Sequence, residues 1–289
     1  MTLLVAIVSW NGRTDLTRCL ESLVSSPPSV PHSITVVDNA SADGSADMVE
    51  STFPSVRLVR SPENLGFARG NNVAIRHDDS DLILLLNPDT VVPPGAIDTL
   101  VSRLVEEPRT AAVGPRIVDG EGRPELSFGA MPTPFAEARR KLLSALYGRG
   151  LSPSTAVVQR MTSRERIVDW VSGACLLVRR SSAEAVGLLD ERYQLYWEDV
   201  DFCAALRARG WHIRFTPAAE IVHLRGRSAA RAPGPTSRAY REGQLAFYAK
   251  HQSRWLPFVR WYLALRYHEQ RPGTEDQGPR DQGPSAHSN

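Results

Sequence analysis

Cysteine is scarce in this chain of 289 residues, which contains only Cys19, Cys175 and Cys203. The three are odd in number and far apart, and none of them shows the paired spacing of zinc ligands. This pattern argues against a disulfide-rich scaffold and against a structural zinc site. It favours a protein that folds in a reducing compartment, and we therefore expect a cytoplasmic location.

Long apolar runs are also missing. No uninterrupted apolar segment approaches the ~20 residues that a membrane-spanning helix needs. The opening residues, MTLLVAIVSWNG, have a short apolar run with no basic segment before it, so we interpret them as a first strand and not as a signal peptide. No G-x-G-x-x-G follows that strand, which disfavours a dinucleotide-dependent oxidoreductase.

Lysine is rare as well, with two among the 34 basic residues, and charge is unevenly distributed. Residues 1–115 hold 14 acids against 8 arginines, a net charge of −6, and the rest holds 18 acids against 26 basic residues, a net charge of +8. A basic second part suits an anionic partner such as a phosphate or a lipid headgroup, or it is simply a solvated surface. No recognised nucleic-acid-binding module is present, and we expect no nucleic-acid partner.

The sequence does contain a regular alternation of apolar runs and amphipathic segments up to about residue 115. Continuous apolar runs are typical of strands buried on both faces of a parallel sheet. The predicted strands occupy residues 3–9, 33–41, 56–61, 81–90 and 110–119. The first predicted helix follows a capping Asp15, and its apolar face is made by Leu16, Cys19, Leu20 and Leu23. We therefore expect an α/β fold with a mostly parallel central sheet flanked by helices.

The second part of the chain is less regular, and it has no internal repeat. Residues 132–166 are polar, basic and interrupted by Pro and Gly, and they predict one short helix. The further predicted elements are a strand in 168–180, a helix in 181–191, a helix in 195–211, two strands around a Pro turn in 212–226, and C-terminal helices in 237–269. Residues 271–289 lack large aliphatic and aromatic side chains and predict a disordered tail.

Polar residues follow three of the predicted strands. These clusters are Ser9-Trp10-Asn11, Asp38-Asn39 and Asn87-Pro88-Asp89. Because the carboxyl ends of parallel strands meet at one edge of the sheet, where ligands bind in such folds, we expect the clusters to form a single site.

Asp89 stands at the tip of the apolar run LILLL, which would hold its carboxylate rigidly. A carboxylate so placed could bind Mg²⁺ or Mn²⁺ on a substrate diphosphate, and the alternative is a strand-terminating Asn-Pro-Asp turn. His223 follows another apolar run, where it is either a structural histidine or a second ligand of the same ion.

Glu198 and Asp199 belong to the segment YWEDVD, at the predicted start of a helix. Acids there interact favourably with the positive end of the helix dipole, and that alone explains one or two of them. A carboxylate held at such a point is also suited to act as a general base toward a hydroxyl. The neighbouring Trp197 is suited to lining a sugar-sized pocket. We expect Asp201 to support the loop structurally.

Two weaker signals lie in the first part of the chain. Asp38 could accept a hydrogen bond from a nucleotide base or a ribose hydroxyl, or form an Asx turn with the residues after it. Asn64, Gly66 and Arg69 lie in a turn that opens a helix and resembles a phosphate-binding loop, although their spacing fits no established phosphate motif.

These motifs, in this order, resemble the family 2 glycosyltransferases, which have a GT-A fold. The resemblance is to the rhamnosyltransferase-like and galactofuranosyltransferase-like branches. The matching stretches are VAIVSWNGRTDLTRCLESL, VVDNASADGS, NLGFARGNN, LLLNPDT, WVSGACLLVRR and LYWEDVDFCAALRARGW with the later IVHLRG, which together cover about three quarters of the chain. Each stretch is modestly specific, whereas the ordered set is highly specific.

The resemblance implies roles for particular residues. Asn87 to Asp89 match the metal motif of the family, which makes Asp89 the direct ligand and leaves Asn87 to act through water. His223 matches a second metal ligand, and the cofactor would be Mn²⁺ or Mg²⁺. Glu198 and Asp199 match the acidic pair of the family, whose second member is the catalytic base.

The remaining matches concern the donor and the acceptor. Nucleotide and donor contacts would come from Ser9, Trp10, Asn11, Asp38, Asn64, Gly66, Arg69 and Asn87. The sugar and acceptor pocket would be lined by Trp170, Gly173 and Trp197. The resemblance divides the chain into a nucleotide-sugar-binding half (1–115), an acceptor-binding and catalytic half of the same GT-A domain (116–236), C-terminal helices (237–270) and the tail (271–289).

The implied reaction is an inverting transfer of a sugar from a nucleotide-diphosphate donor to an acceptor hydroxyl. The resemblance favours dTDP-rhamnose as donor and a glycan or lipid-linked acceptor used in cell-surface polysaccharide synthesis. UDP-sugar donors, a soluble natural-product acceptor and a non-catalytic nucleotide-sugar-binding or regulatory protein remain alternatives. Two stretches that mix Arg with aromatic and aliphatic residues, ARRKLLSALYGR and RWLPFVRWYLALRYH, are either helices packed on the domain or helices at the inner surface of the cytoplasmic membrane.

Overall fold

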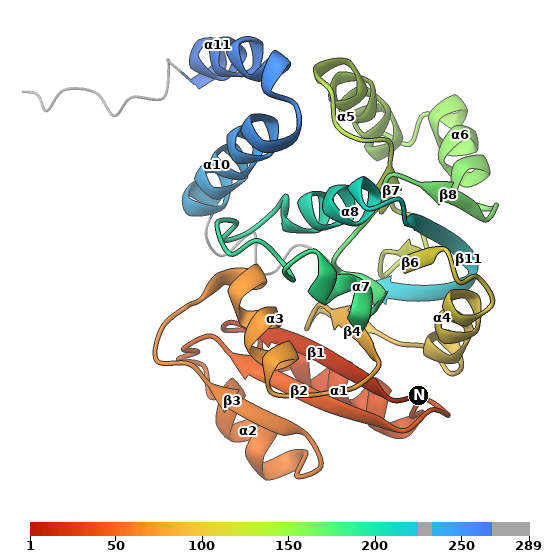
Figure 1. Cartoon of the computed structure of the whole chain (residues 1–289), viewed down its shortest axis with the longest axis vertical. Coiled ribbons are helices and arrows are strands. Elements are labelled where there is room, and N and C mark those ends of the chain that lie inside the picture. Colours follow the sequence, from red (N-terminus) through yellow and green to blue (C-terminus); the bar gives the residue numbers. More distant parts are fainter. Residues whose placement is uncertain (225–232, 268–289) are drawn as a thin grey trace, which may run out of the picture.

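A nine-stranded sheet forms the centre of the molecule in the computed structural model, which describes residues 1–224 and 233–267 (Figure 1). Its strand order is β3-β2-β1-β4-β10-β6-β11-β5, with β8 paired to β11. The strands are β1 Leu3–Ser9, β2 His32–Asp38, β3 Arg57–Arg60, β4 Leu82–Leu86, β5 Thr90–Val91, β6 Thr110–Val118, β8 Arg166–Val168, β10 Cys175–Arg179 and β11 His212–His223. A separate two-stranded sheet pairs β7 Phe128–Gly129 with β9 Trp170–Val171.

The first four strands confirm the predicted parallel arrangement. β1 pairs with β2 and β4, and β2 pairs with β3, all in parallel register. Every residue of β1 and of β4 is buried, as expected of apolar runs covered on both faces. The ends of β1 and β2 lie in register, with Ser9 opposite Asp38. The predicted α/β class is therefore correct.

Three helices connect these strands, α1 Arg13–Ser25, α2 Ser45–Thr52 and α3 Gly66–Arg76, and α4 Ala96–Val105 lies between β5 and β6. The residues that α1 buries are Asp15, Leu16, Cys19, Leu20 and Leu23, which confirms its predicted face. The predicted cap at Asp15 is wrong, because α1 begins at Arg13 with Gly12 as its N-cap, and Asp15 lies buried in the first turn. The N-cap of α2 is Gly44, in the left-handed conformation. Asp43, one residue earlier, accepts the Ser45 N–H.

The middle of the sheet departs from simple βα alternation. The predicted strand in 168–180 is divided between β9 and β10, and β10 runs antiparallel to β4 and β6. The two strands expected in 212–226 are one strand, β11, which is irregular between Thr216 and Glu220, where Pro217 lies. β6 spans the predicted boundary at residue 115 and pairs with β11, so one sheet joins both halves.

The second part of the chain adds the helices α5 Pro134–Gly148, α6 Ser152–Thr162, α7 Arg180–Ala185, α8 Glu198–Ala208, α10 Pro233–His251 and α11 Leu256–Tyr267, with a short 3₁₀ turn, η1, at Ser253–Trp255. The sequence predicted α5 but missed α6. The predicted tail, residues 271–289, lies outside the described residues. No helix in residues 1–224 and 233–267 has the length and apolarity to cross a bilayer.

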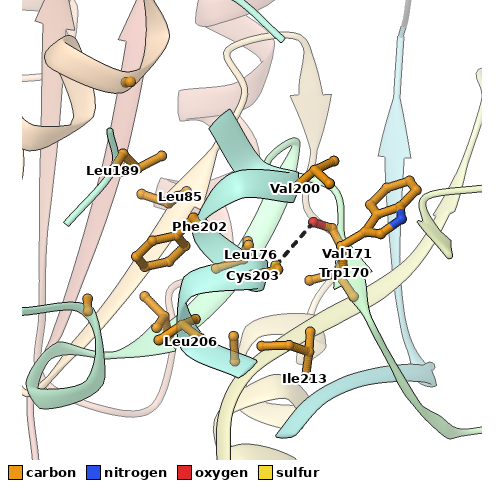
Figure 2. Close-up of a cluster of buried hydrophobic side chains, with 14 of the residues drawn as sticks. Leu85, Trp170, Val171, Leu176, Leu189, Val200, Phe202, Cys203, Leu206 and Ile213 are labelled. Carbon is orange, nitrogen blue, oxygen red and sulfur yellow. Dashed lines mark hydrogen bonds between the residues drawn. The ribbon is translucent and has the colours of Figure 1, made fainter. Parts of the chain in front are cut away.

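The two faces of the sheet carry separate apolar clusters. One contains α1, α2 and α4 side chains, and the other joins α3 and α8 to α10. Figure 2 shows Phe202, Cys203 and Leu206 of α8 gathered among Leu85, Leu176 and other buried residues of the second cluster. Because α8 packs on the sheet in this way, its first residues are held at the edge where the predicted strands end.

Candidate active site

The first cluster of predicted site residues forms where β11 meets β5. His223 ends β11 and lies opposite Thr90 of β5 in antiparallel register. This pairing brings His223 Nε2 within 3.1 Å of Asp89 Oδ1 and within 3.5 Å of Asn87 Nδ2. The two predicted metal ligands are therefore adjacent, although they are 134 positions apart in the chain.

Glu125 is a member of this cluster that the sequence did not reveal. Its Oε2 atom lies 3.6 Å from His223 Nδ1, on the other side of the ring from Asp89. Burial lowers the pKa of an imidazole, but hydrogen bonds to the Asp89 and Glu125 carboxylates outweigh it and raise the pKa of His223 to about 9. Glu125 belongs to no recognisable motif, so only the packed structure identifies it.

The cluster fits a divalent cation. Asp89 and His223 offer an oxygen and a nitrogen ligand to a single point, which suits Mn²⁺ or Mg²⁺ completed by substrate oxygens. A carboxylate on the second ring nitrogen of the histidine, as Glu125 provides, is the usual way in which a ligating imidazole is oriented. Within the described ranges, no three His, Cys, Asp or Glu side chains are arranged to hold a metal on their own.

The second cluster lies at the start of α8. Asp199 is partly buried, and its two carboxylate oxygens accept the N–H groups of Gly173 at 2.9 Å and of Val200 at 2.8 Å. Burial raises the pKa of Asp199 above its usual value, against the opposing effect of these two N–H groups. A carboxyl group with a raised pKa is better matched to proton abstraction near neutral pH.

Glu198 occupies a more enclosed position than Asp199. It is buried, and its Oε2 atom has no hydrogen-bond partner among the residues that the structure describes. Burial, and then the neighbouring charge of Asp199, raise the pKa of Glu198 well above its usual value. Two adjacent acids thus differ in environment, with Asp199 hydrogen-bonded and Glu198 enclosed.

The backbone just before α8 is strained. Tyr196 and Trp197 have φ angles of 69° and 74°, in the left-handed region that bulky residues rarely adopt. Gly243 of α10 lies against this turn, where an added Cβ atom would stand 3.0 Å from both Tyr196 O and Trp197 Cδ1. Strained residues of this kind persist only where the surrounding structure holds them, and here α10 does so.

A cavity of about 470 Å³ opens in front of the second cluster. It is lined by Glu198 and Asp199 and by the predicted pocket residues Trp170 and Trp197. Its opposite wall is α5, whose Arg140 guanidinium lies 4.5 Å above the Trp170 ring. Aromatic walls beside carboxylates suit a sugar, and the arginines of α5 suit an anionic group on the same molecule.

The two clusters are joined through one short loop. The Asn87 N–H donates to the Ala174 carbonyl, while the neighbouring Gly173 N–H donates to Asp199. At Gly173 an added Cβ atom would stand 3.3 Å from both Asp199 Cβ and Phe67. The predicted pocket residue Gly173 therefore positions the carboxylate of Asp199 and admits no larger side chain without movement.

The predicted nucleotide-binding residues gather at the ends of β1 and β2. Asp38 Oδ2 accepts the Ser41 N–H in the expected Asx turn, whereas the buried Oδ1 atom has no partner in the described structure. Asn11 links the two strand ends through hydrogen bonds with Ser41 and Ala42, and Trp10 is exposed beside it. Ser9 is fully buried, and its carbonyl accepts the Asn39 N–H.

The turn before α3 contacts the turn before α8. Gly66 has φ +76°, and an added Cβ atom would stand 2.4 Å from the carbonyl oxygen of Gln194, so close packing explains this glycine. The Phe67 N–H donates to the same carbonyl. Asn64 accepts the Gly66 N–H, and Arg69 is exposed on α3 beside Glu63.

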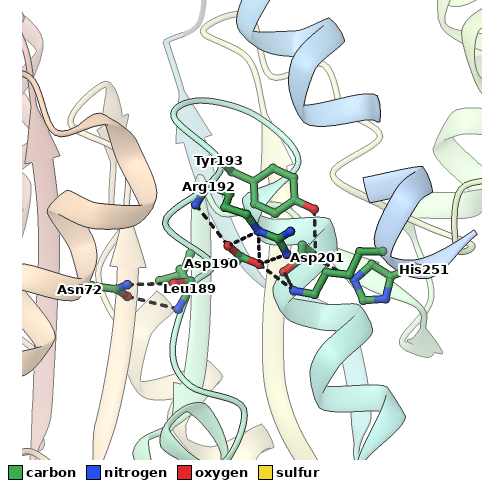
Figure 3. A network of polar contacts seen from close by, with 8 residues as sticks. Asn72, Leu189, Asp190, Arg192, Tyr193, Asp201 and His251 are labelled. Carbon is green, nitrogen blue, oxygen red and sulfur yellow. Dashed lines mark hydrogen bonds and ion pairs between the residues drawn. The ribbon is translucent and has the colours of Figure 1, made fainter. Parts of the chain in front are cut away.

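The contacts of Asp201 agree with the structural role predicted for it. This buried carboxylate accepts hydrogen bonds from Tyr193 Oη and His251 Nε2, over 3.1 and 2.7 Å, and Figure 3 shows the three side chains together. Lys250 donates to Asp201 and to Asp190, at 2.8 Å in each case. The network ties α8 to α10 and to the loop that leads into the strained turn.

Comparison with known proteins agrees with the sequence motifs. The family described as Glycosyltransferase like family 2 matches residues 2–256. An N-acetylglucosaminyl-diphospho-decaprenol L-rhamnosyltransferase of Mycobacterium tuberculosis is 34% identical over 280 residues, which are 91% of each chain. The rhamnosyltransferase WbbL of Escherichia coli is 27% identical over 165 residues, which are 55% of this chain and 60% of WbbL.

Solved structures support the same fold. The mannosyltransferase PcManGT from Pyrobaculum calidifontis, in complex with GDP-Man and Mn²⁺, superposes with a TM-score of 0.54 at 16% identity and covers 93% of this chain and 76% of its own. GalNAc-T7 with UDP, GalNAc and Mn²⁺ gives 0.59 at 16% identity, over 78% of this chain and 43% of its own. The expected GT-A fold is confirmed, and this chain is a glycosyltransferase that belongs to glycosyltransferase family 2.

Proposed function

We propose that the protein transfers L-rhamnose, with inversion, from dTDP-rhamnose to a hydroxyl group of a glycan carried on a polyprenyl diphosphate. The observation that carries this proposal is the position of Asp199, a partly buried carboxylate with a raised pKa at the wall of an aromatic-lined cavity. The transfer would take place at the inner face of the cytoplasmic membrane, in the synthesis of cell-surface glycans.

In this mechanism Asp199 is the general base. The Gly173 and Val200 N–H groups hold its carboxylate in one orientation at the cavity wall. Asp199 takes the proton from the acceptor hydroxyl as the oxygen attacks the anomeric carbon of the donor. The bond to the nucleotide diphosphate breaks on the opposite face, so a single displacement inverts the configuration and needs no enzyme nucleophile.

Asp89 and His223 would hold the divalent cation, with Asn87 acting through water. When bound, Mn²⁺ or Mg²⁺ supplies charge neutralisation for the departing diphosphate. Glu125 keeps the His223 ring oriented toward Asp89. The adjacency of Asp89 and His223, and the Mn²⁺ present with two structural relatives, support this assignment.

The donor nucleotide would lie across the ends of β1 and β2. The Asp38 Oδ1 atom lacks a partner among the residues that the structure describes, and buried polar atoms seldom remain unpaired, so a nucleotide base or ribose donor is its expected partner. Trp10 and Asn11 would contact the nucleotide, and the exposed Arg69 would approach the diphosphate. Ser9 would contribute by holding the strand end.

The identity of the sugar and of the acceptor rests on the relatives. The Mycobacterium tuberculosis relative is named for L-rhamnose transfer to N-acetylglucosaminyl-diphospho-decaprenol, and the Escherichia coli relative is named as a rhamnosyltransferase. The cavity agrees with such an acceptor, because Trp170 and Trp197 suit a sugar ring while Arg139 and Arg140 suit its diphosphate.

A donor and acceptor screen tests the proposal. Purified protein with Mn²⁺ is incubated with dTDP-rhamnose, UDP-sugars and GDP-sugars, each without an acceptor, with a diphospholipid-linked N-acetylglucosamine, or with a soluble aglycone. We expect transfer from dTDP-rhamnose alone, with inversion visible in the anomeric proton signal of the product. Transfer from a UDP-sugar overturns the donor assignment, and transfer only to a soluble aglycone overturns the acceptor assignment. Donor binding without turnover favours a regulatory protein.

A further inference from the structure

Helix α5 is a feature of the molecule that the proposed reaction does not fully explain. None of its fifteen residues is buried. Phe135, Ala138, Leu142 and Ala145 recur at helical spacing and are all exposed, and Phe135 is exposed to 73%. Because an isolated helix of this length is marginal in water, and helices in proteins are stabilised by packing an apolar face, this stripe indicates a missing contact surface.

Helix α11 has a second apolar stripe of the same kind. Val259 faces the protein core, while an adjoining face of the helix carries Phe258, Trp261, Tyr262 and Leu265 at intervals of three, one and three residues. Their exposed fractions are 46%, 59%, 36% and 59%. Exposed apolar side chains that gather in one patch on a protein surface mark an interaction site.

The two stripes lie at the same end of the molecule. Figure 1 shows α5 and α11 next to each other at the top of the view. Phe135 of α5 contacts Trp255, the residue before α11, with ring centroids 5.6 Å apart. This ring contact links the two stripes, and we treat them together as one surface.

The charge of this surface identifies its partner. Residues 253–267 contain Arg254, Arg260 and Arg266 and no acid, and α5 carries three basic residues against the single acid Glu137. Trp and Tyr prefer the boundary between lipid tails and headgroups, where arginines pair with anionic lipids. We propose that α5 and α11 form a docking surface for an anionic lipid bilayer.

The inner side of α5 connects this surface to the active site. Arg139, Arg140 and Leu143 line the cavity that contains Asp199. Glu137 accepts hydrogen bonds from Gln244 and Tyr248 of α10, at 2.8 and 2.6 Å, and α10 holds the turn that carries Trp197. A bilayer beneath α5 would thus present a lipid-linked acceptor directly to the cavity, a reason for docking that rests on the proposed function.

Vesicle flotation of the full-length protein tests the docking surface without any acceptor. We expect the protein to float with phosphatidylcholine vesicles that contain phosphatidylglycerol, and much less with phosphatidylcholine alone. The double variant Trp261→Ser/Leu265→Ser should weaken vesicle binding by roughly tenfold or more, because it removes two apolar side chains that would insert into the bilayer. The control Val24→Ser/Val105→Ser, which removes two exposed valines of α1 and α4, should bind like the wild type.

Three outcomes overturn the proposal: absence of flotation, equal flotation of the double variant, or equal binding to neutral vesicles. Light scattering after gel filtration can give a fourth such outcome. If the wild type is a dimer and the double variant is a monomer, the surface binds a second copy of the chain and not a bilayer. Donor binding by thermal shift separates this proposal from the proposed function. A double variant that binds dTDP-rhamnose normally but not vesicles supports docking, and vesicle binding without any donor response leaves docking intact while rejecting the reaction.

Discussion

Helices α1 and α5 have similar lengths, 13 and 15 residues, yet α1 buries five side chains and α5 buries none. The helix α1 covers one face of the central sheet, and its buried side chains pack there in the apolar cluster with α2 and α4. The helix α5 forms one wall of a cavity and exposes its other side. The two parts of the chain differ in a similar way. The first supplies the parallel strands β1 to β4, and the second adds β10 and β11 to the same sheet and lines the cavity in front of Asp199.

The largest expected effect is the loss of turnover when Asp199, the proposed base in the second part of the chain, is replaced. Asp199→Asn should lower turnover by about 100- to 10,000-fold, because the amide cannot accept the acceptor proton. Donor binding, for which we propose residues at the ends of β1, β2 and β4, should stay within about twofold, as calorimetry with Mn²⁺ measures it. The variant Asp201→Asn controls for damage to α8. Near-normal turnover in Asp199→Asn would reject this residue as the base.

The next experiment removes Asp89, the proposed metal ligand in the first part of the chain. Asp89→Ala should weaken Mn²⁺-dependent donor binding by at least about 100-fold, because loss of a ligand should exceed the effect of losing its supporting residues. Calorimetry of the donor with and without Mn²⁺ measures this difference. Glu125→Gln should give a smaller loss. If donor affinity in Asp89→Ala still rises on adding Mn²⁺ as it does in the wild type, the ion binds elsewhere.

A smaller effect tests whether α10 holds the catalytic turn. Gly243→Val should lower the free energy of unfolding by about 1–3 kcal/mol, because the added atoms meet Trp197 and the Tyr196 carbonyl. It should also lower kcat while KM for the donor stays unchanged. Ala249→Val, at an exposed position of the same helix, is the matched control. Reduced stability with an unchanged kcat would limit Gly243 to a folding role.

The smallest effect concerns the loop before that turn. The Arg192 guanidinium and then the Lys250 ammonium, acting against burial, lower the pKa of Asp190 below its usual 3.8. A depressed pKa in the folded state means that this stabilisation is present above the unfolded value and disappears as the pH falls. Asp190→Asn should therefore cost less than about 1 kcal/mol near neutral pH, where solvent screens the pair.

The pH dependence gives the measurement. Urea unfolding of wild type and Asp190→Asn should show a difference near neutral pH that shrinks as the pH approaches about 2. The exposed Asp79 provides the control substitution, Asp79→Asn, whose difference from the wild type should stay close to zero throughout. A difference for Asp190→Asn that grows with acidity would contradict the assigned ion pairs.

Much of the first part was predictable, because its elements depend on local patterns. The apolar run before Asp89 and the single face of α1 each follow from the spacing of a few neighbouring residues. The second part was harder to predict. The strand expected in 168–180 is divided into β9 and β10, and Pro217 does not interrupt β11, because pairing with β6 on both sides of the irregularity holds the chain extended.

The residues of the candidate site divide in the same way into those that the sequence predicts and those that it does not. Asp89 and Asp199 could be identified because each stands at the end of a strongly patterned segment. Glu125 could not, since its role depends on contact with His223, which is 98 residues later in the chain. Gly66 resembled part of a phosphate loop, whereas its closest contact is the backbone of Gln194.

The sequence by itself determined the strands of the parallel sheet, the polar residues at their ends and the family of the protein, because periodicity and motif order are properties of neighbouring residues. Only the tertiary structure decided that His223 meets Asp89, that the Gly173 N–H orients Asp199 and that α5 has no buried face. Each of these facts depends on packing between segments far apart in the chain, which no local pattern encodes.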